Sequence, residues 1–203
     1  MKPTKQHIQD HALKLFNEKG FVNVRLQHIA DSAFVIVGHL AYHFKNKEAI
    51  IESLYDELKA KQGLLLAEFR VVPLFEDINR YLISTYHQQS GYIFFYVDTI
   101  EIVRAYPQIQ KKYSQHILWQ LAQLKLMLGF NIARGSFIPL ADQQVDHLSW
   151  QLRSIIDLWR YIIKTEGTKS ETEQTFLNDI WGVLTPLFTD MGNREYRQLH
   201  LKG

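Results

Sequence analysis

The chain has 203 residues, 46% hydrophobic and 22% charged, so it can fold around a core and is not a disordered segment. It has no cysteine, which excludes disulfides and cysteine-ligated zinc, and no apolar run of about 18 residues, so we expect a cytoplasmic protein without a membrane span. The net charge is only +2, but residues 1–50 carry seven basic residues against four acidic ones. Positive charge is therefore concentrated near the N-terminus.

Three short helices are predicted at the start of the chain. Apolar residues recur at helical spacing from Ile8 to Phe16, and Gly20 can end that helix because glycine tolerates a positive φ. Two shorter apolar stripes follow in residues 26–33 and 37–44, only a few residues apart. Two short helices on a tight turn, braced by a longer one, are typical of a helix-turn-helix, whose second helix enters the DNA major groove.

Three short motifs follow one another in the first quarter of the chain. They are Ala12-Leu13-x-Leu15-Phe16-x-x-Lys19-Gly20-Phe21, then Ile29-Ala30, and then Gly38-x-Leu40-x-Tyr42-His43-Phe44-Lys45-Asn46-Lys47-Glu48. This arrangement resembles the N-terminal domain of TetR-family transcriptional regulators. The resemblance implies a homodimer with a DNA-binding head and a helical C-terminal domain for a small ligand.

The segment also departs from the family pattern. Phe34 replaces the usual turn glycine, and a bulky side chain at positive φ costs on the order of 1 kcal/mol or more. Ile36 replaces the serine that usually opens the recognition helix, Val24 and Arg25 replace another cap, and Ala41 replaces a tyrosine. Two interpretations stay open: the head binds DNA weakly, or an apolar contact such as Ile36 or Val37 against a thymine methyl redirects its specificity.

The resemblance and the predicted helix faces together select the candidate DNA contacts. Tyr42 falls where the family places a tyrosine on the DNA backbone, although it can equally be a packing residue. Lys47 lies in the first turn of a fourth helix capped by Asn46, where a bound phosphate would offset its repulsion by the helix dipole. The full set is Arg25, Gln27, His28, Val37, His39, Tyr42, His43 and Lys47.

The remainder of the chain also reads as helical. We predict a break at Val71–Pro73, a helix from Leu74 to about Tyr86, and a long helix from Pro107 to Gly135. The apolar segment from Gly91 to Arg104 is compatible with a buried strand, but we predict one buried helix because no turn signal interrupts it.

The last two long helices are apolar on more than one face, which indicates a second partner surface. By resemblance to the family, they would pair with a second subunit in a four-helix bundle. The predicted dimer contacts are Leu152, Ile156, Trp159, Ile180, Leu184 and Leu187. Pro186 should clash with the carbonyl of Gly182, and we expect the final helix to bend there without ending. We expect the polar tail from Gly192 to Gly203 to fray.

The family resemblance also implies a ligand cavity. An apolar or aromatic lining with a few polar groups is typical of such sites, although aromatic residues at helical spacing are more often ordinary core. The candidates are Tyr86, His87, Phe94, Phe95, Asp98, Trp119 and Phe130.

Two histidine pairs, His39 with His43 and His7 with His11, have the spacing of metal ligands. We predict no metal site or other cofactor because neither pair has an evident third ligand. An enzyme is not expected, because no nucleophile with a base and no paired carboxylates stand at suitable spacing.

The predicted fold is all-α, with an N-terminal three-helix helix-turn-helix domain (1–47, homeodomain-like) and a C-terminal helical ligand-binding and dimerisation domain (48–203). The predicted function is a TetR-like transcriptional regulator, a repressor, that binds a palindromic operator in double-stranded DNA under control of a small-molecule effector. The alternative is a ligand- or protein-binding dimer on the same scaffold with a degenerate head.

Overall fold

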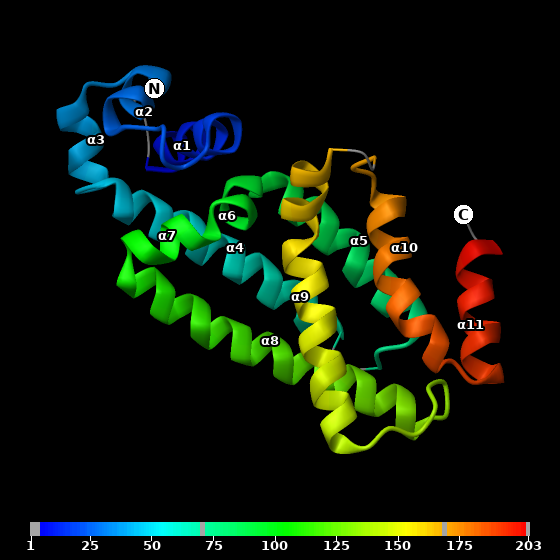
Figure 1. The fold of residues 1–203 in the computed structure, drawn as a ribbon. Coiled ribbons are helices and arrows are strands. Elements are labelled where there is room, and N and C mark those ends of the chain that lie inside the picture. The colour runs from blue at the N-terminus through cyan, green and yellow to red at the C-terminus, as the bar shows by residue number, and fades with distance from the viewer. Residues whose placement is uncertain (1–4, 70–71, 168–169, 202–203) are drawn as a thin grey trace. The chain divides into compact units, whose positions relative to one another are not determined.

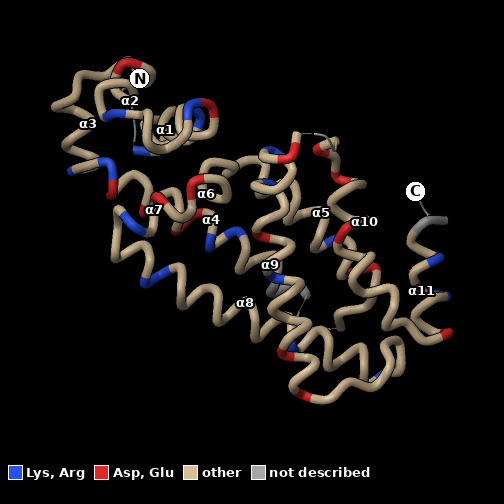
Figure 2. Tube along the Cα trace, in the orientation of Figure 1, with Lys and Arg blue, Asp and Glu red and all other residues tan. Residues whose placement is uncertain are grey.

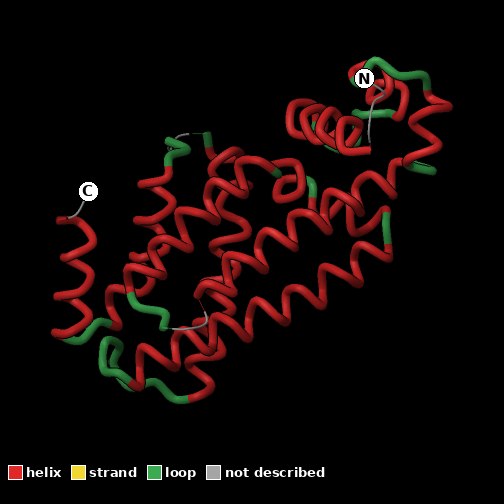
Figure 3. Tube along the Cα trace, turned by 180° about the vertical axis from the view of Figure 1, so that it is seen from behind, coloured by secondary structure: helices red, strands yellow, loops and turns green. Residues whose placement is uncertain are grey.

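The structure, a computed structural model, describes residues 5–69, 72–167 and 170–201, which form helices and connecting loops without a β-strand (Figure 1, Figure 3). The prediction of an all-α fold is confirmed. In chain order the helices are α1 Lys5–Lys19, α2 Leu26–Ser32, α3 Val37–His43, α4 Lys47–Phe69, α5 Phe75–Gly91, α6 Ile93–Val97, α7 Thr99–Ala105, α8 Pro107–Ala133, α9 Asp142–Glu166, α10 Glu173–Leu184, the 3₁₀ turn η1 Thr185–Leu187, and α11 Asp190–Leu201.

The chain divides into two compact units. The first combines residues 1–61 with residues 88–114, and the second combines residues 62–87 with residues 115–203. The first unit thus contains α1, α2 and α3, which we call the head. It also contains the first part of α4 and the whole of α6 and α7. These two units divide the chain at other positions and do not test the predicted domain boundary after residue 47, which stays a prediction.

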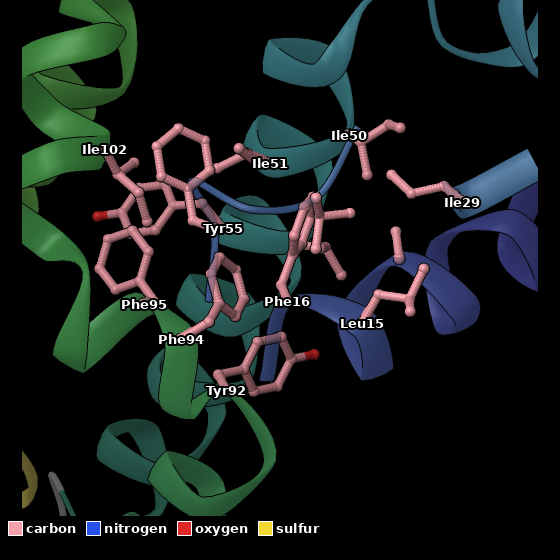
Figure 4. Close-up of a cluster of buried hydrophobic side chains, with 14 of the residues drawn as sticks. Leu15, Phe16, Ile29, Ile50, Ile51, Tyr55, Tyr92, Phe94, Phe95 and Ile102 are labelled. Carbon is pink, nitrogen blue, oxygen red and sulfur yellow. The ribbon is translucent and has the colours of Figure 1, made fainter. Parts of the chain in front are cut away.

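The core of the first unit joins the head to α6 (Figure 4). Phe16 of α1 packs on Phe94 of α6 at 5.2 Å between ring centroids, and Tyr55 of α4 stacks on Phe95 at 4.9 Å. The Asn17 side chain adds two hydrogen bonds, donating to the Gly91 carbonyl at 2.8 Å and accepting from the Phe94 amide at 3.1 Å. The end of α1 is therefore fixed to the beginning of α6.

The segment 91–104 is helical, as predicted, but it is two helices and not one. α6 ends and α7 begins at Asp98, whose φ and ψ are −99° and 15°. The Asp98 carboxylate accepts a hydrogen bond of 2.6 Å from the Phe21 amide, just after Gly20 takes a φ of +76°. The prediction failed because this break is stabilised by a residue far away in the sequence, and a local pattern does not record that.

The limits of two other helices agree with the sequence. Asn46 caps α4 by accepting a hydrogen bond of 2.9 Å from the Ala49 amide, which confirms the predicted cap. The predicted break at Val71–Pro73 falls between α4 and α5, although residues 70–71 lie outside the described residues.

The second unit has a core of aromatic residues on α5, α9, α10 and the loops that follow α8 and α10. Phe75 of α5 lies 5.4 Å from Phe137 and 5.3 Å from Trp181, while Trp159 of α9 meets Phe176 of α10 at 5.2 Å. The inner faces of α9 and α10 are therefore covered within the subunit.

The expected bend at Pro186 is wrong, because α10 ends at Leu184 and Pro186 lies in η1. The chain then becomes extended at Phe188, whose ring stacks on Phe137 at 5.8 Å. Backbone bonds from the Ile138 amide to the Leu187 carbonyl (2.8 Å) and from the Thr189 amide to the Ser136 carbonyl (3.1 Å) hold this conformation. Pro186 by itself does not require α10 to end. The helix ends because these tertiary contacts stabilise the extended conformation that follows it.

The predicted fraying of the tail is also wrong for the described residues, because residues 190–201 form α11. Tyr196 packs on Trp181 at 5.1 Å, and Glu195 forms an ion pair with Arg134. Gly192 makes the docking possible, since a Cβ at this position would lie only 2.3 Å from the Ser136 carbonyl oxygen. A polar helix is thus retained by a few specific contacts.

We expect Gly192→Ala to lower the free energy of unfolding by about 1–3 kcal/mol, because the added methyl group overlaps a backbone oxygen. The matched control is Gly129→Ala in α8, where an added Cβ meets nothing within 4 Å and the higher helix propensity of alanine is worth up to ~1 kcal/mol. Urea unfolding of the two variants measures both effects, and equal stability of the two would contradict the tight contact at Gly192.

Candidate DNA-binding site

α2, a tight turn and α3 form a helix-turn-helix over the core of the first unit. The Ala33 amide bonds to the Ile29 carbonyl at 2.9 Å, and the Val35 amide reaches back to the Ala30 carbonyl at 2.9 Å, which closes the turn. Between them Phe34 has a φ of 56°, and it is the only non-glycine residue with positive φ within the described ranges. The predicted strain at this position is therefore present, and the Phe34 side chain is 89% exposed.

The helix caps in this motif are weak, as the sequence predicts. Ile36 occupies the N-cap of α3 and makes no side-chain hydrogen bond to the helix. At the start of α2, the Arg25 amide donates a hydrogen bond of 3.2 Å to Nδ1 of His28, a partial substitute for a serine or threonine cap.

The exposed face of α3 is nearly devoid of polar side chains. Leu40 is buried in the head together with Phe44, the residue that follows the helix. The opposite face consists of Gly38, Ala41 and Tyr42, at the three- and four-residue spacing of one helix side. We call this face, together with Ile36 at the N-cap, the reading face. Lys45 is exposed just beyond its C-terminal end.

Of the predicted DNA contacts, Arg25, Gln27, His28 and Tyr42 are exposed, and Tyr42 is 85% accessible. The Gln27 side chain already donates to Asp31 at 2.6 Å. Val37 is half-buried against the head core, so little of it is accessible to DNA.

His39 and His43 lie on the side of α3 next to the reading face. Their rings stack at 5.2 Å, and their Nε2 atoms are 3.2 Å apart, so one ring donates a hydrogen bond to the other. The second pair, His7 and His11, instead contacts the Ala33 carbonyl (3.2 Å) and the Ser32 hydroxyl (2.8 Å). Within the described residues, no group of three metal-ligating side chains occurs.

Lys47 has a structural role that the sequence analysis missed. Its ammonium group donates to the Phe21 carbonyl and lies 4.1 Å from the centroid of the Phe21 ring. Burial lowers the pKa of Lys47, and the nearby Asp98 carboxylate opposes this shift. Much of this positive charge is directed into the protein and not toward solvent.

Gly38, Ala41 and Lys45 are accessible but are not among the predicted DNA contacts, and Ile36 is named there only as an alternative apolar contact. Helical phase alone could have found Gly38 and Ala41, because positions 38, 41 and 42 lie opposite the apolar residue Leu40. These two were omitted because polar residues were favoured over accessible small ones.

The predicted ligand-binding residues are divided between the two units. Phe94 and Phe95 are buried in the core of the first unit, and Asp98 binds the Phe21 amide there. In the second unit, Tyr86 packs on Phe176 at 5.7 Å and donates to the Glu171 carbonyl. His87 pairs with Glu173 at 2.8 Å, Trp119 stacks on His116 at 5.3 Å, and Phe130 lies 5.8 Å from the Arg134 guanidinium.

A different set of residues encloses an apolar cavity in the second unit. Its volume is about 20 Å³, enough for little more than a water molecule. The Tyr81 side chain and Gln123 are its polar neighbours, and burial raises the pKa of Tyr81 to about 12, so its hydroxyl stays neutral. The lining residues are Ile78, Tyr81, Leu82, Gln123, Leu124, Met127, Leu152, Ile156, Ile180 and Leu184.

The predicted dimer contacts mostly face the subunit's own core. Leu152, Ile156, Trp159, Ile180 and Leu184 are buried in the second unit, and Leu187 is half-buried against the same cluster. The large apolar side chains of α9 that remain about half exposed are Trp150, Leu158, Tyr161 and Ile162. They share the outer side of α9, which we call the α9 outer face.

The fold and the head geometry define a helix-turn-helix DNA-binding regulator. Comparison with known families agrees: "Bacterial regulatory proteins, tetR family" matches residues 8–54, and "Bacterial transcriptional repressor" matches residues 61–196. The second match covers more than half of the chain. The chain therefore belongs to the TetR family of transcriptional regulators, whose members are regulators and not enzymes.

Individual relatives support the assignment. The HTH-type negative transcriptional regulator IcaR of the biofilm operon icaADBC in Staphylococcus aureus is 24% identical over 89% of this chain and 96% of its own length. The probable HTH-type transcriptional regulator YttP of Bacillus subtilis is 44% identical, but the match spans only 27% of this chain and 26% of YttP.

A solved structure extends the likeness to the full chain. A TetR-family transcriptional regulator from Marinobacter aquaeolei VT8 superposes with a TM-score of 0.90 at 26% identity, covering 100% of this chain and 98% of that one. Among the described helices none is long and apolar enough to cross a membrane.

Proposed function

We propose that the chain is a homodimeric repressor that binds a palindromic operator through two copies of the head and releases it in response to a small apolar effector. The observation that carries this proposal is the reading face on α3 of a TetR-family helix-turn-helix, which is exposed and adjoined by the exposed Lys45. In a two-fold symmetric dimer, two such helices would enter successive major grooves about 34–36 Å apart.

The exposed cations of the head would fix the protein on the DNA backbone. Arg25 at the start of α2 and Lys45 after α3 are both exposed and suited to phosphate contacts, and the Tyr42 hydroxyl can donate to a phosphate oxygen. Gln27, His28, His39 and His43 supply further hydrogen-bonding groups near the groove. Because the partly buried Val37 and Lys47 have internal contacts, we assign them a supporting role.

Dimerisation is proposed through the α9 outer face. Since α9 and α10 cover their inner faces within the subunit, the exposed Trp150, Leu158, Tyr161 and Ile162 are the apolar surface that α9 offers to the second copy.

We expect Leu158→Glu to convert the dimer into a monomer, because a carboxylate buried against the partner would be desolvated without a counter-charge. Sedimentation equilibrium measures the mass of the protein in solution. Operator affinity should fall when the dimer is lost. The control is Leu126→Glu on α8, which replaces a leucine that is also exposed but lies outside the α9 outer face. Loss of the dimer in the control alone would place the interface elsewhere.

The effector is proposed to occupy the apolar cavity of the second unit. At about 20 Å³ the cavity is too small for a ligand, so binding would require the helices that line it to separate. A ligand that favours one arrangement of the dimer by ~1–3 kcal/mol would shift the population of DNA-binding dimers. The lining exposes only apolar surface to the cavity, which favours a slender apolar molecule.

The function is tested by titrating the purified protein with a selected operator at several salt concentrations. A repressor head predicts binding that weakens linearly in log–log form as salt rises, because phosphate contacts release counterions. A folded dimer that binds no duplex at low salt would contradict the proposal.

The competing function is a partner-binding dimer with a degenerate head. The observation in its favour is the exposure of Phe34 and Ile36, since exposed apolar side chains also mark protein-contact surfaces. On this alternative, Phe34→Gly and Ile36→Ser together would create strong DNA binding where the natural head has little.

A further inference from the structure

The reading face lacks the side chains that usually recognise bases by hydrogen bonding. Gly38 has no side chain, Ala41 ends in a methyl group, and the N-cap residue Ile36 is a hydrocarbon. Tyr42 alone among these residues carries a polar atom. No arginine, asparagine, glutamine or carboxylate lies on this face, although these residues make the bidentate contacts to guanine, adenine and cytosine.

The two histidines beside this face are already engaged. His39 and His43 direct their Nε2 atoms at each other across 3.2 Å, so neither ring offers that nitrogen to a base without breaking the pair. Their arrangement leaves the centre of the face to Gly38 and Ala41. At this point the protein presents the major groove with a smooth apolar surface.

The turn before α3 extends that surface at a cost to the fold. Ile36 is 77% exposed and caps nothing, and Phe34 is 89% exposed although its φ of 56° disfavours any side chain with a Cβ. Neither side chain belongs to the head core. Two large hydrocarbon groups are thus exposed to solvent in the turn between α2 and α3.

The major groove contains one feature that an apolar side chain can recognise. Thymine places its C5 methyl group there, and alanine, phenylalanine and threonine methyl groups are known partners for it. Because glycine has no side chain, position 38 would let the helix backbone approach the base edges more closely than any larger residue would.

We propose that Ile36 and Ala41 recognise thymine methyl groups in each half-site, with Phe34 extending the apolar contact along the groove. This inference rests on the proposed function and specifies how its DNA is selected. The departures from the usual family residues then redirect recognition toward thymine-containing steps and do not abolish it.

The charges around the reading face favour DNA over a protein as its occupant. Residues 1–50 carry seven basic against four acidic residues, and Lys45 and Arg25 are both exposed in the helix-turn-helix. Figure 2 marks the basic positions of the head along the chain. An apolar strip adjoined by cations matches a groove with methyl groups between two rows of phosphates.

The test compares operators that differ only in methyl groups. Duplex DNA is first selected from a random pool with the wild-type dimer, and each thymine of the recovered half-site is then replaced in turn by deoxyuridine. Deoxyuridine keeps every hydrogen-bonding group of thymine and removes the C5 methyl. We expect affinity to fall about fourfold for each contacted methyl group, at one or two positions per half-site, with an unchanged salt dependence.

Two variants locate the contact. At one position of the half-site, the Ile36→Ser variant should bind the operator with thymine and the operator with deoxyuridine equally well. Its binding should keep the salt dependence of the wild type. Val22→Ser removes another exposed hydrocarbon of the head, in the turn before α2, and should leave the discrimination intact. Circular dichroism of both variants checks that the head remains folded.

The outcomes separate this inference from the proposed function. A selected operator that binds equally well with deoxyuridine at every position overturns the methyl recognition and leaves the repressor in place. Recovery of no duplex at all, from a folded dimer, overturns the proposed function itself. Because the deoxyuridine series uses the wild-type protein, it decides the question even if Ile36→Ser does not fold.

Discussion

Replacing Phe94 by alanine is expected to destabilise the first unit by about 3–5 kcal/mol and to abolish operator binding in the absence of any ligand. Phe94 is buried in α6, with its ring 5.2 Å from Phe16 of the head and its amide bonded to Asn17. Truncation leaves a cavity at the point where α1 joins α6. Hydrogen exchange of amides in α1 and α2 measures the loss of local stability.

The control for this prediction is Phe130→Ala, which truncates a half-buried phenylalanine of α8 in the second unit. Exchange in the head should be unaffected by it. If Phe94→Ala leaves exchange in α1 unchanged and alters only the response to an effector, Phe94 lines a ligand site, as the sequence alone led us to predict.

Replacing Arg160 by methionine should lower the free energy of unfolding of the second unit by about 3 kcal/mol. Arg160 is 2% exposed, and its guanidinium joins Glu171 to the Tyr86 carbonyl at 2.7 Å, above the Tyr86 ring at 4.5 Å. Without it the part-buried Tyr86 carbonyl loses this donor and Glu171 loses its counter-charge. Urea unfolding followed by tryptophan fluorescence gives the change.

Arg80→Met provides the comparison, because the Arg80 ion pair with Asp77 is exposed and its loss should change stability by no more than about 0.5 kcal/mol. Equal effects of the two substitutions would show that the Arg160 contacts contribute no more than a surface ion pair.

Helical periodicity was sufficient to predict the elements with a regular apolar stripe. α8 begins at Pro107 and ends at Ala133 before Gly135, whose φ is +81°, and Leu40 and Phe44 are buried as expected. These features depend on residues close in the sequence, so the sequence determines them locally.

Periodicity leaves open the role of residues whose environment is set by distant parts of the chain. Phe94 and Phe95 fit a ligand pocket and a protein core equally well by pattern, and the contacts of α6 with α1 and α4 place both rings in the core of the first unit. The same holds for α9, where pattern reveals two apolar faces but not which one the subunit covers itself.

α11 illustrates a third kind of limit. Its sequence is mostly polar and ends the described chain, so fraying was the natural expectation. The helix is retained by the packing of Tyr196 on Trp181 and by the close approach of Gly192 to Ser136. Neither contact leaves a periodic signal, although a glycine inside a helix can mark such an approach.

The exposed apolar residues of the head admit two explanations, and a single experiment separates them. Selection of random duplex DNA by the purified dimer, at low and at physiological salt, tests most directly whether the head is a working DNA reader. We expect a palindrome with half-sites about one helical turn apart and thymines facing the reading face. Recovery of no sequence from a folded dimer at either salt concentration would contradict this expectation.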